Sequence, residues 1–312
     1  MATKKVTKAK KAAPKKAPAK KAAVKKAPAK KAAPVPAAPA ADGSPAPELT
    51  NPTWETVKIA RHPDRPLFID YLTTWDPEHI ELHGDRLVAD DPAMYAGLAT
   101  IDGERVVIVG HRKGRTTEEK IANRFGMANP DGYRKAMRIM RIAEKFNLPI
   151  VALVDTSGAF PGLDAEARGQ AEAIAKNLAD MSVLKTQIVV VVTGEGGSGG
   201  ALGIAVGDRI LMLEHAIYSV ISPEGCASIL WRDGKMAPVA AEALKVTSGN
   251  LKKLGIIDDI IPEPKGGAHT DPKKTIETVK KAVLAAIKEL KKVPVEKLVE
   301  QRYAKFAAMG RH

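Results

Sequence analysis

The sequence predicts an α/β fold with parallel strands, and three observations carry this prediction. Two short, almost wholly apolar runs, IVALVD (150–155) and IVVVVT (188–193), are typical of strands that are buried on both faces. Each run is followed by a glycine-rich loop and then by a segment with apolar residues at helical spacing. Strand, loop and helix therefore alternate along the chain, which indicates helices layered on a parallel sheet.

The first 47 residues are expected to form a disordered basic arm and linker, so we place the globular domain at residues 48–312. Residues 1–41 hold 13 lysines and no Asp or Glu, and residues 9–34 repeat a Lys/Ala/Pro pattern with a period of ten. Paired lysines repel one another, and frequent prolines block a continuous helix. Two roles stay open for residues 1–41: weak, salt-sensitive binding of polyanions such as nucleic acid, or solubilisation without a specific partner.

Charge and cysteine content limit the class of protein. The formal net charge is +13, but outside the arm 36 Lys and Arg residues balance 36 Asp and Glu residues, so the body is formally neutral. The single cysteine, Cys226, allows no intramolecular disulfide and no Cys-based zinc site on this chain. No apolar run reaches the roughly 18 residues of a membrane span, and no secretory signal opens the chain. We expect a cytoplasmic protein.

The first elements of the body are a helix and a hairpin. Asn51-Pro52 is typical of a helix N-cap followed by Pro at the first helical position, and the helix is expected to run to about Arg61. Residues 95–101 and 104–111 are apolar runs joined by Asp102-Gly103, which strongly indicates a β-hairpin. A helix begins near Asn129-Pro130, with an apolar stripe made of Ala136, Ile139, Met140, Ala143 and Phe146.

The remaining elements follow the two buried strands. A helix from about Asp164 to Ser182 is predicted by a stripe of Ala167, Ala171, Ile174, Leu178 and Met181. Residues 201–206 are expected to begin the next helix, and residues 210–213 and 217–221 are expected to be strands. Helices are then predicted over about 236–254, 270–292 and 295–308, the second of them with a stripe of Ile276, Val279, Val283, Ile287 and Leu290.

The two glycine-rich loops, GEGGSGG (194–200) and SGAFPG (157–162), are the best candidates for a binding site. Glycine lets the backbone approach a ligand closely, and a helix that starts there offers free N–H groups to a phosphate or a developing oxyanion. The alternative is a tight structural turn. The spacing fits neither a Walker A loop, a dinucleotide fingerprint nor a nucleophile elbow. Loops after neighbouring parallel strands meet at one edge of the sheet, so we expect one crevice.

Side-chain catalysts are harder to identify. Ser198 is a possible nucleophile, but no His lies near it in the sequence. Asp155 is better explained as a cap, whereas Glu195 is equally a base or a carboxylate bonded to its own loop. His111 and His269 are interpreted as structural, and Cys226 as a small core residue. Since no His, Asp or Glu cluster has metal-ligand spacing, the pattern favours a site built from backbone donors.

Several long motifs, in a fixed order, resemble one known family. They include ARHPDRP (60–66), GHRKGRTTEEKI (110–121), VDTSGAFPG (154–162), GEGGSGGALGIAVGD (194–208) and YSVISPEGCASILW (218–231). Over about residues 48–310 the chain resembles the alpha subunits of acetyl-CoA carboxylase carboxyltransferase. The resemblance implies a crotonase-like fold, a spiral of ββα units with flanking helices. It also implies transfer of the carboxyl group from carboxybiotin, on its carrier protein, to acetyl-CoA, which gives malonyl-CoA for fatty acid biosynthesis.

The resemblance further implies partners. A beta subunit would supply most of the acetyl-CoA site and a zinc ribbon, with no metal on this chain, in an assembly of two alpha and two beta chains. The biotin carboxyl carrier protein and biotin carboxylase would complete the enzyme, and the assembly would bind ATP. Two other classes stay open: a stand-alone acyl-CoA hydratase or isomerase, and a nucleic-acid-binding or regulatory protein.

Site residues carried over from the resemblance fall in the two glycine-rich loops. The N–H groups of Gly199 and Gly200 would hold the ureido oxygen of biotin, and this is their catalytic role. Substrate-binding residues would be Gly158, Ala159, Phe160, Gly196 and Gly197. No protein nucleophile is required, because the freed biotin nitrogen can act as the base. Two departures are the basic arm, which replaces a helical N-terminal segment, and Ser157 with Phe160, where many relatives are expected to have Pro and Tyr.

Overall fold

The computed structural model describes residues 51–310, so the predicted arm at residues 1–47 lies outside the described residues. One mixed sheet forms the centre of this part, with the strand order β1-β2-β3-β4-β5-β6-β8 and β7 paired with the end of β5. The pairs from β1 to β3 are antiparallel, and all later pairs are parallel. The strands are β1 (Ile80–Glu81), β2 (Met94–Ile101), β3 (Glu104–His111), β4 (Ile150–Thr156), β5 (Ile188–Gly197), β6 (Arg209–Leu213), β7 (Ile217–Ser219) and β8 (Asp259–Ile261).

The hairpin of β2 and β3 turns at Asp102 and Gly103, as the sequence predicts. Both residues have positive φ, 47° and 83°, and Ile101 pairs with Glu104. This is the geometry of a two-residue turn whose twist matches that of the strands. The parallel strands β4 and β5 are buried over almost their whole length, which confirms the interpretation of the two apolar runs.

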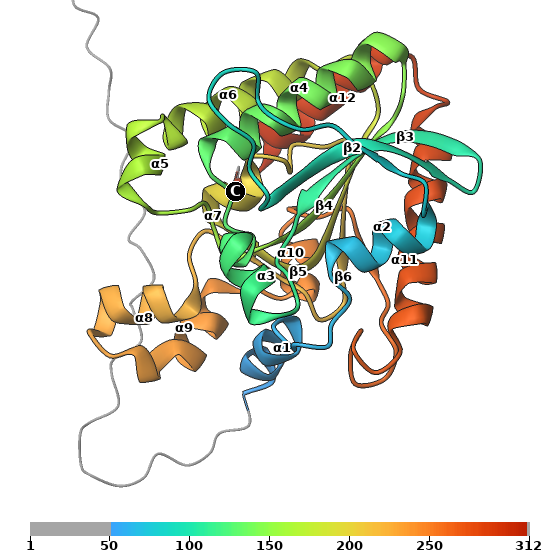
Figure 1. The fold of residues 1–312 in the computed structure, drawn as a ribbon. Coiled ribbons are helices and arrows are strands. Elements are labelled where there is room, and N and C mark those ends of the chain that lie inside the picture. The colour runs from blue at the N-terminus through green and yellow to red at the C-terminus, as the bar shows by residue number, and fades with distance from the viewer. Residues whose placement is uncertain (1–50, 311–312) are drawn as a thin grey trace, which may run out of the picture. The chain divides into compact units, whose positions relative to one another are not determined.

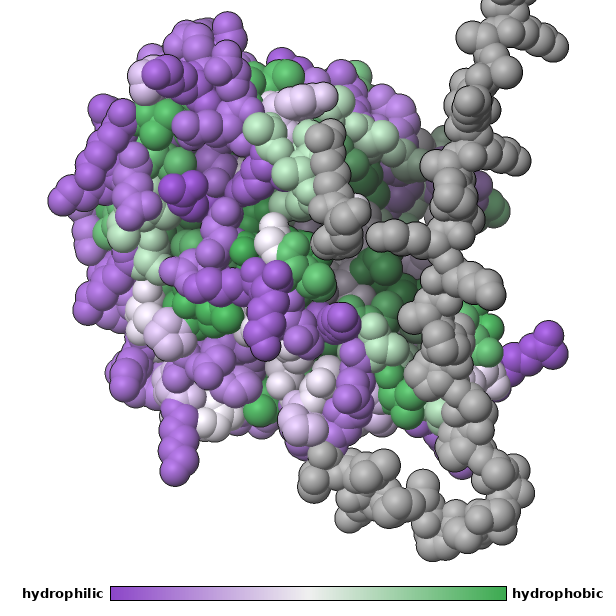
Figure 2. All heavy atoms as spheres, turned by 180° about the vertical axis from the view of Figure 1, so that it is seen from behind, coloured by the Kyte–Doolittle hydropathy of each residue, from purple (hydrophilic) through white to green (hydrophobic). Residues whose placement is uncertain are grey.

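Helices cover both faces of the sheet (Figure 1). On one face α4 (Pro130–Phe146) contacts β2 and β3, and α6 (Gln170–Val183) lies between α4 and α12 (Val295–Ala308). On the other face α2 (Phe68–Trp75) contacts β2, and α11 (Pro272–Leu290) contacts β5. Figure 2 shows the molecule from behind. Hydrophilic side chains cover most of the left part of this face, and apolar side chains appear there only in patches.

The apolar stripe predicted from the sequence is confirmed in full for α11 and in part for α4. All five stripe residues predicted for α11 are buried. In α4 the first four stripe residues are fully buried, but Phe146 is 61% exposed. Phe146 is the last residue of α4, and the chain turns away at Asn147, which has a left-handed φ of 53°. The stripe therefore ends one turn before the sequence pattern does.

The single helix predicted over residues 164–182 is wrong. The chain forms α5 (Leu163–Ala167) and then α6, separated at Gly169, whose φ of 83° cannot continue a right-handed helix. Ala167 and Ala171 are exposed, and the core-facing residues of α6 include Asn177. Its amide donates to the carbonyl oxygens of Tyr133 and Gly203, 2.9 Å away in each case. A polar residue whose amide is fully hydrogen-bonded thus occupies a core-facing position for which the pattern predicts an apolar residue.

Other boundaries also differ. Residues 194–197 continue β5 instead of forming a loop, and α7 (Ser198–Leu202) starts three residues before the predicted helix. The helix predicted over residues 236–254 is divided into α9 (Ala237–Leu244) and α10 (Ser248–Lys253) by left-handed Lys245. The elements not predicted include α2, α3 (Thr117–Ala122), β8 and α8 (Pro223–Trp231).

The first and last helices were predicted correctly and anchor the ends of the described chain. Asn51 caps α1 (Pro52–Ala60) by accepting hydrogen bonds from the N–H groups of Thr53 and Trp54. In α12 the guanidinium of Arg302 is fully buried and donates to Asp208. Within residues 51–310, the helices are all too short or too polar to cross a membrane.

Candidate functional site

A bulge in the central strand β5 shapes the site. Val154 pairs with Val192, but the next paired residues are Thr156 and Gly196, so residues 193–195 of β5 stand opposite Asp155 alone. Before the bulge β5 pairs with β6, and from Glu195 onward it pairs with β7. Bulges bend a strand and redirect the residues that follow. This one directs residues 196–200 out of the core of the sheet, at its carboxyl edge.

The two glycine-rich segments lie against each other, as the sequence predicts. A side chain at Gly197 would overlap the carbonyl of Ser157 and come within 2.9 Å of the nitrogen of Gly158. A side chain at Gly200 would overlap Gly158 and come within 2.5 Å of the nitrogen of Ala159. Glycine is therefore required at both positions for the backbones to touch. This contact joins the ends of β4 and β5 into one crevice.

The N–H groups of the second segment point away from the ladder of the sheet. Ser198 has a left-handed φ of 50°, and this turn starts the short helix α7. Gly199 and Gly200 belong to its first turn, where N–H groups have no acceptor within the helix. Neither N–H donates to another part of the described chain. A side chain at Gly199 would meet only Ile174, at 3.5 Å, so a ligand could approach the backbone there.

The loop after β4 is held by its own hydrogen bonds. The hydroxyl of Thr156 donates to the Gly158 carbonyl at 2.7 Å and accepts from the Gly158 N–H at 3.1 Å. The N–H of Phe160 donates to the carbonyl of Ala128, and the guanidinium of Arg124 lies 5.6 Å from the centre of the Phe160 ring. The sequence-predicted substrate residues 158–160 thus form a fixed wall beside the glycines.

Charged side chains surround the bulge. Glu195 accepts from Nε of Arg61 at 2.7 Å, and its other oxygen lies 3.5 Å from Nζ of Lys113. Lys113 also pairs with Asp155, at 2.7 Å, and Asp155 accepts from the N–H of Glu195 at 2.9 Å. Arg61 continues to Glu224 on α8, with Nη1 2.5 Å from the carboxylate. We call Arg61, Lys113, Asp155, Glu195 and Glu224 the bulge network.

These ion pairs fix the charge states of the network. Burial alone would lower the pKa of Lys113, but the nearby carboxylates of Asp155 and Glu195 outweigh it and raise that pKa. Burial would raise the pKa of Glu224, but its hydrogen bond with Arg61 lowers it instead. Lys113 and Arg61 therefore stay protonated. Glu195 is neither exposed nor bonded to its own loop, as the second interpretation had it, because its carboxylate is buried and pairs with Arg61 and Lys113 from distant segments.

The other candidate catalysts do not form a catalytic group. Ser198 makes no hydrogen bond to a described residue, so it has no base to activate it. His111 is fully buried against the backbone of Gly200, on the inner side of the glycine segment. Burial lowers the pKa of His111 to about 3, so the ring is neutral. His269 stacks on His62, and Cys226 is a half-buried residue packed beside Ala227.

Asp155 corrects the sequence interpretation. It was expected to cap the loop that follows it, but its carboxylate reaches across to β5 and to Lys113. Lys113 and Arg61 were not predicted as site residues. Both lie in motifs of the family resemblance, GHRKGR and ARHPDRP, and that was the only signal in the sequence that could have identified them.

Of the hollows that adjoin the network, two share part of their lining. A small one of about 20 Å³ is lined by Gly196, Gly197 and Ser222 among others. A larger one of about 310 Å³ is lined by Lys113, Lys120, Phe125 and other residues. Arg61, Ser157 and Glu195 line both. The ion pair of Arg61 and Glu195 therefore forms the partition between these hollows.

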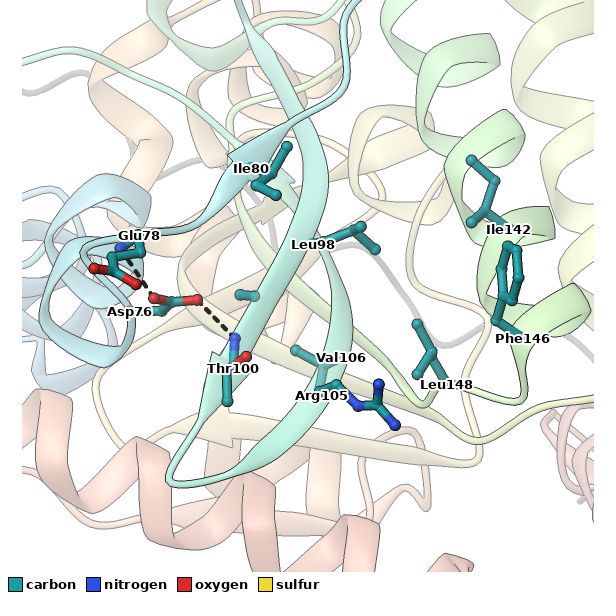
Figure 3. Close-up of a pocket in the computed structure, with 11 residues that line it drawn as sticks. Asp76, Glu78, Ile80, Leu98, Thr100, Arg105, Val106, Ile142, Phe146 and Leu148 are labelled. Atoms are coloured by element: carbon teal, nitrogen blue, oxygen red, sulfur yellow. Dashed lines mark hydrogen bonds between the residues drawn. The ribbon is translucent and has the colours of Figure 1, made fainter.

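A third hollow, of about 510 Å³, lies away from the glycines beside the β2–β3 hairpin (Figure 3). Its wall is mostly apolar and includes Leu98, Val106 and Phe146. The carboxylate of Asp76 accepts hydrogen bonds from the N–H groups of Glu78 and Thr100, so its lone pairs serve the backbone. This hollow offers little chemistry, and the glycine crevice is the better candidate site. Among the described residues, no three His, Cys, Asp or Glu side chains are placed to hold a metal ion.

Comparisons with known proteins agree on one family. The model of the family described as "Acetyl co-enzyme A carboxylase carboxyltransferase-like" matches residues 47–310. A protein of Geobacter sulfurreducens, named acetyl-coenzyme A carboxylase carboxyl transferase subunit alpha, is 60% identical over 83% of this chain and 81% of its own length. A protein of Salinispora arenicola, named for subunits beta/alpha together, is 55% identical over 82% of this chain and 45% of its own length.

Solved structures show the same architecture at low identity. A transcarboxylase 12S structure superposes with a TM-score of 0.59 at 19% identity, over 77% of this chain and 44% of that one. At this identity the likeness shows the fold alone. It confirms the predicted α/β, crotonase-like fold class for the described part of the chain.

Proposed function

Because the chain belongs to the acetyl-CoA carboxylase carboxyltransferase family, as an alpha subunit, we propose that its glycine crevice holds the biotin end of the reaction. The function of the family is to move a carboxyl group from carboxybiotin to acetyl-CoA, which gives malonyl-CoA. The chain is accordingly a transferase that acts on a biotin-derived substrate together with a partner subunit. One observation carries the placement of biotin: two adjacent N–H groups without an acceptor in the described chain, at Gly199 and Gly200, belong to a segment that touches Gly158 and Ala159.

The two donors suit the urea group of biotin in their chemistry. The ureido oxygen is an acceptor that gains negative charge when the carboxyl group leaves, so it needs donors that are already oriented. Gly199 and Gly200 are fixed by the contact of Gly200 with the opposite loop and by the turn at Ser198. A preoriented donor of this kind lowers a barrier by roughly 3 kcal/mol. The ring face of Phe160 and the backbones of Gly196 and Gly197 would form the walls.

No side chain of the crevice needs to act as a nucleophile or base. Carboxybiotin supplies the carboxyl group and, after losing it, a nitrogen that can take the proton of the acetyl group. Glu195 and Asp155, the nearest carboxylates, are both engaged with Lys113. The chain's own contribution is therefore to bind, orient and stabilise charge. This argues against the stand-alone hydratase or isomerase, which would need a free acid and base at the thioester.

The partners are proposed from the family. A beta subunit would bring the acetyl-CoA site and the zinc, in an assembly of two alpha and two beta chains, and a carrier protein would deliver carboxybiotin made by an ATP-dependent biotin carboxylase. We also propose a cytoplasmic location and synthesis of fatty acids as the setting. For residues 1–41 we propose polyanion binding that is independent of catalysis, because all of the excess positive charge lies there.

Reconstitution tests the proposed function. The full chain is mixed with a beta-type subunit, acetyl-CoA and carboxybiotin, and malonyl-CoA is measured against each subunit alone. The expected result is product from the mixture and almost none from either chain by itself. Activity of the chain alone on an enoyl-CoA would favour the hydratase alternative. No malonyl-CoA from a stable complex of the two subunits would contradict the assignment.

A further inference from the structure

We propose that Lys113 is a positioning residue for the donors Gly199 and Gly200, which it holds in place through Asp155, Glu195 and the bulge of β5. This inference rests on the proposed function for its kinetic readout, but its structural readout stands alone. Lys113 lies between the two carboxylates, 2.7 Å from Asp155 and 3.5 Å from Glu195. No contact of Lys113 with the glycines themselves is needed.

At the bulge the ladder between β4 and β5 is interrupted over residues 193–195, although Glu195 and the two residues after it pair with β7 on the other side. Side chains from distant segments bond to the interrupted stretch. The carbonyl of Thr193 accepts from Nε of Arg65 at 2.7 Å. The N–H of Glu195 donates to Asp155, and the Glu195 carboxylate accepts from Arg61. Every one of these bonds involves a charged side chain. The path of residues 196–200 therefore depends on the charges around the bulge as well as on glycine and on the pairing with β7.

Lys113 is the cation that makes this arrangement stable. Asp155 is 5% exposed and Glu195 is 9% exposed, so neither carboxylate can rely on water. Arg61 serves only Glu195 and Glu224, and no other cation pairs with Asp155 in the described part of the chain. Removing the ammonium would leave two nearby buried carboxylates, one of them without a partner. Repulsion between them would push Glu195, and the segment it begins, away from β4.

The position of Lys113 suits support better than contact with substrate. Its side chain is 20% exposed, and a side chain at Gly126 would come within 2.8 Å of its Cγ. The turn at Gly126 thus covers the stem of the lysine, and the ammonium faces the carboxylates. Arg124 and Phe125, which precede Gly126, have left-handed φ values of 46° and 56°. This unusual turn is what allows the chain to pass so close above Lys113.

Four forms of the full chain, each with the beta-type partner, test the proposal: wild type, Lys113→Met, Lys113→Met/Asp155→Asn and Lys305→Met. The double variant replaces the ion pair by uncharged hydrogen bonds between positions 155 and 195. The Asn amide can accept from the Glu195 N–H and donate to the Glu195 carboxylate. Lys305 is the matched control. It is also 20% exposed, and it pairs with Asp258 at 2.7 Å beside Asp208, whose carboxylate binds the N–H of Ile188 at the opposite end of β5.

The expected kinetic result is a fall in kcat of Lys113→Met by a factor on the order of 10², the effect of misplacing a catalytic group by about an ångström. KM for acetyl-CoA stays unchanged, because that thioester binds on the partner. Lys305→Met keeps its kcat although its melting temperature falls. The double variant recovers most of the lost kcat, which a cation that touched substrate could not do.

Hydrogen exchange gives a readout that does not need activity. Amides of residues 195–197, which are hydrogen-bonded or paired in β5, should exchange faster in Lys113→Met, recover in the double variant and stay unchanged in Lys305→Met. Equal exchange and equal kcat in Lys113→Met and Lys305→Met would overturn the positioning role. A double variant as slow as Lys113→Met would do the same. An inactive wild-type complex with the expected exchange pattern would instead overturn the proposed function and leave the bulge network supported.

Discussion

Arg302 donates from its guanidinium to both carboxylate oxygens of Asp208, at 2.7 and 2.8 Å, where no water reaches either group. The same guanidinium donates to the carbonyl oxygens of Met181, Leu184 and Thr186. Arg302 therefore provides hydrogen-bond donors to the carbonyl groups at the end of α6 and before β5, and to the carboxylate of the residue just before β6.

Replacing Arg302 is therefore expected to destabilise the domain strongly. Arg302→Met leaves Asp208 buried without its partner, and such a change costs about 3–5 kcal/mol. Urea unfolding of the full chain measures the loss. Arg141→Met is the control, because Arg141 is 53% exposed and pairs with Asp180 at the surface, where a pair contributes about 0–1 kcal/mol. Equal losses in the two variants would contradict this ranking.

Stability should decline in acid because of Glu263. Burial would raise the pKa of this carboxyl, but hydrogen bonds with His215 and Arg65 lower it to about 2. A lowered folded-state pKa stabilises the protein above the unfolded value of 4.5, and the gain is lost as pH falls toward 2. The loss amounts to roughly 3 kcal/mol for this group. Urea unfolding at several pH values should show a shallower decline for Glu263→Gln than for the wild type, and parallel curves would refute the assignment.

The partner of that carboxylate has the opposite pH dependence. The hydrogen bond with Glu263 raises the pKa of His215 above 6.5. Its contribution is complete below pH 6.5 and is lost as pH rises through the raised pKa. In His215→Gln the decline in stability that the wild type shows as pH rises above 6.5 should therefore be absent. An NMR titration of His215 in the wild type and in Glu263→Gln checks the direction of the shift.

The two donor glycines should respond differently to a side chain. Gly199→Val adds bulk that meets nothing closer than Ile174 at 3.5 Å, so the fold should tolerate it while ligand approach is blocked. Gly200→Ala forces its methyl into Gly158 and should cost about 1–3 kcal/mol by overpacking. Melting temperature and carboxyl transfer are measured for both. Normal turnover in Gly199→Val would contradict the role given to its N–H.

A pair of exposed glycines isolates backbone conformation from packing. Gly103 and Gly249 both have open space around the position of a side chain, but only Gly103 has a positive φ. Gly103→Ala should destabilise by about 1 kcal/mol, since it strains the turn. Gly249→Ala, in α10, should stabilise by about 0.4–1 kcal/mol. Thermal unfolding of both variants gives the sign, and activity should stay at the wild-type level in each.

Deleting residues 1–41 removes 13 lysines and no acid. DNA binding of the truncated chain should fall to the level expected of a neutral body, and the steep salt dependence should disappear with it. Carboxyl transfer with the beta-type partner should survive. Retained DNA affinity would place the binding surface on the body instead.

The sequence predicts those parts of the fold that depend on local patterns. The stripe of α11, the hairpin at Asp102-Gly103 and the cap at Asn51 each follow from residues a few positions apart. The break at Gly169 was missed because a single glycine inside an apolar pattern is compatible with a continuous helix. Asn177 was missed because its burial depends on carbonyls of Tyr133 and Gly203, which belong to other elements.

The site was predictable to a similar extent. Its glycines could be identified, because glycine at a close approach has no substitute. The bulge could not, since residues 193–195 read as the end of one strand and the start of a loop. Its supports come from Arg61 and Lys113, which are 134 and 82 residues away from Glu195. Such pairings depend on how the whole chain folds, so they produce no repeating pattern in the sequence.

Helix α1 spans the short distance between Asn51 and the bulge network. Asn51, at the start of the helix, donates to the carbonyl of Pro238. Arg61, just past its end, forms an ion pair with Glu195. Nine helical residues measure about 14 Å. A fluorophore attached to the exposed first turn of α1 would therefore lie about one helix length from Glu195, close enough to report on changes at the site.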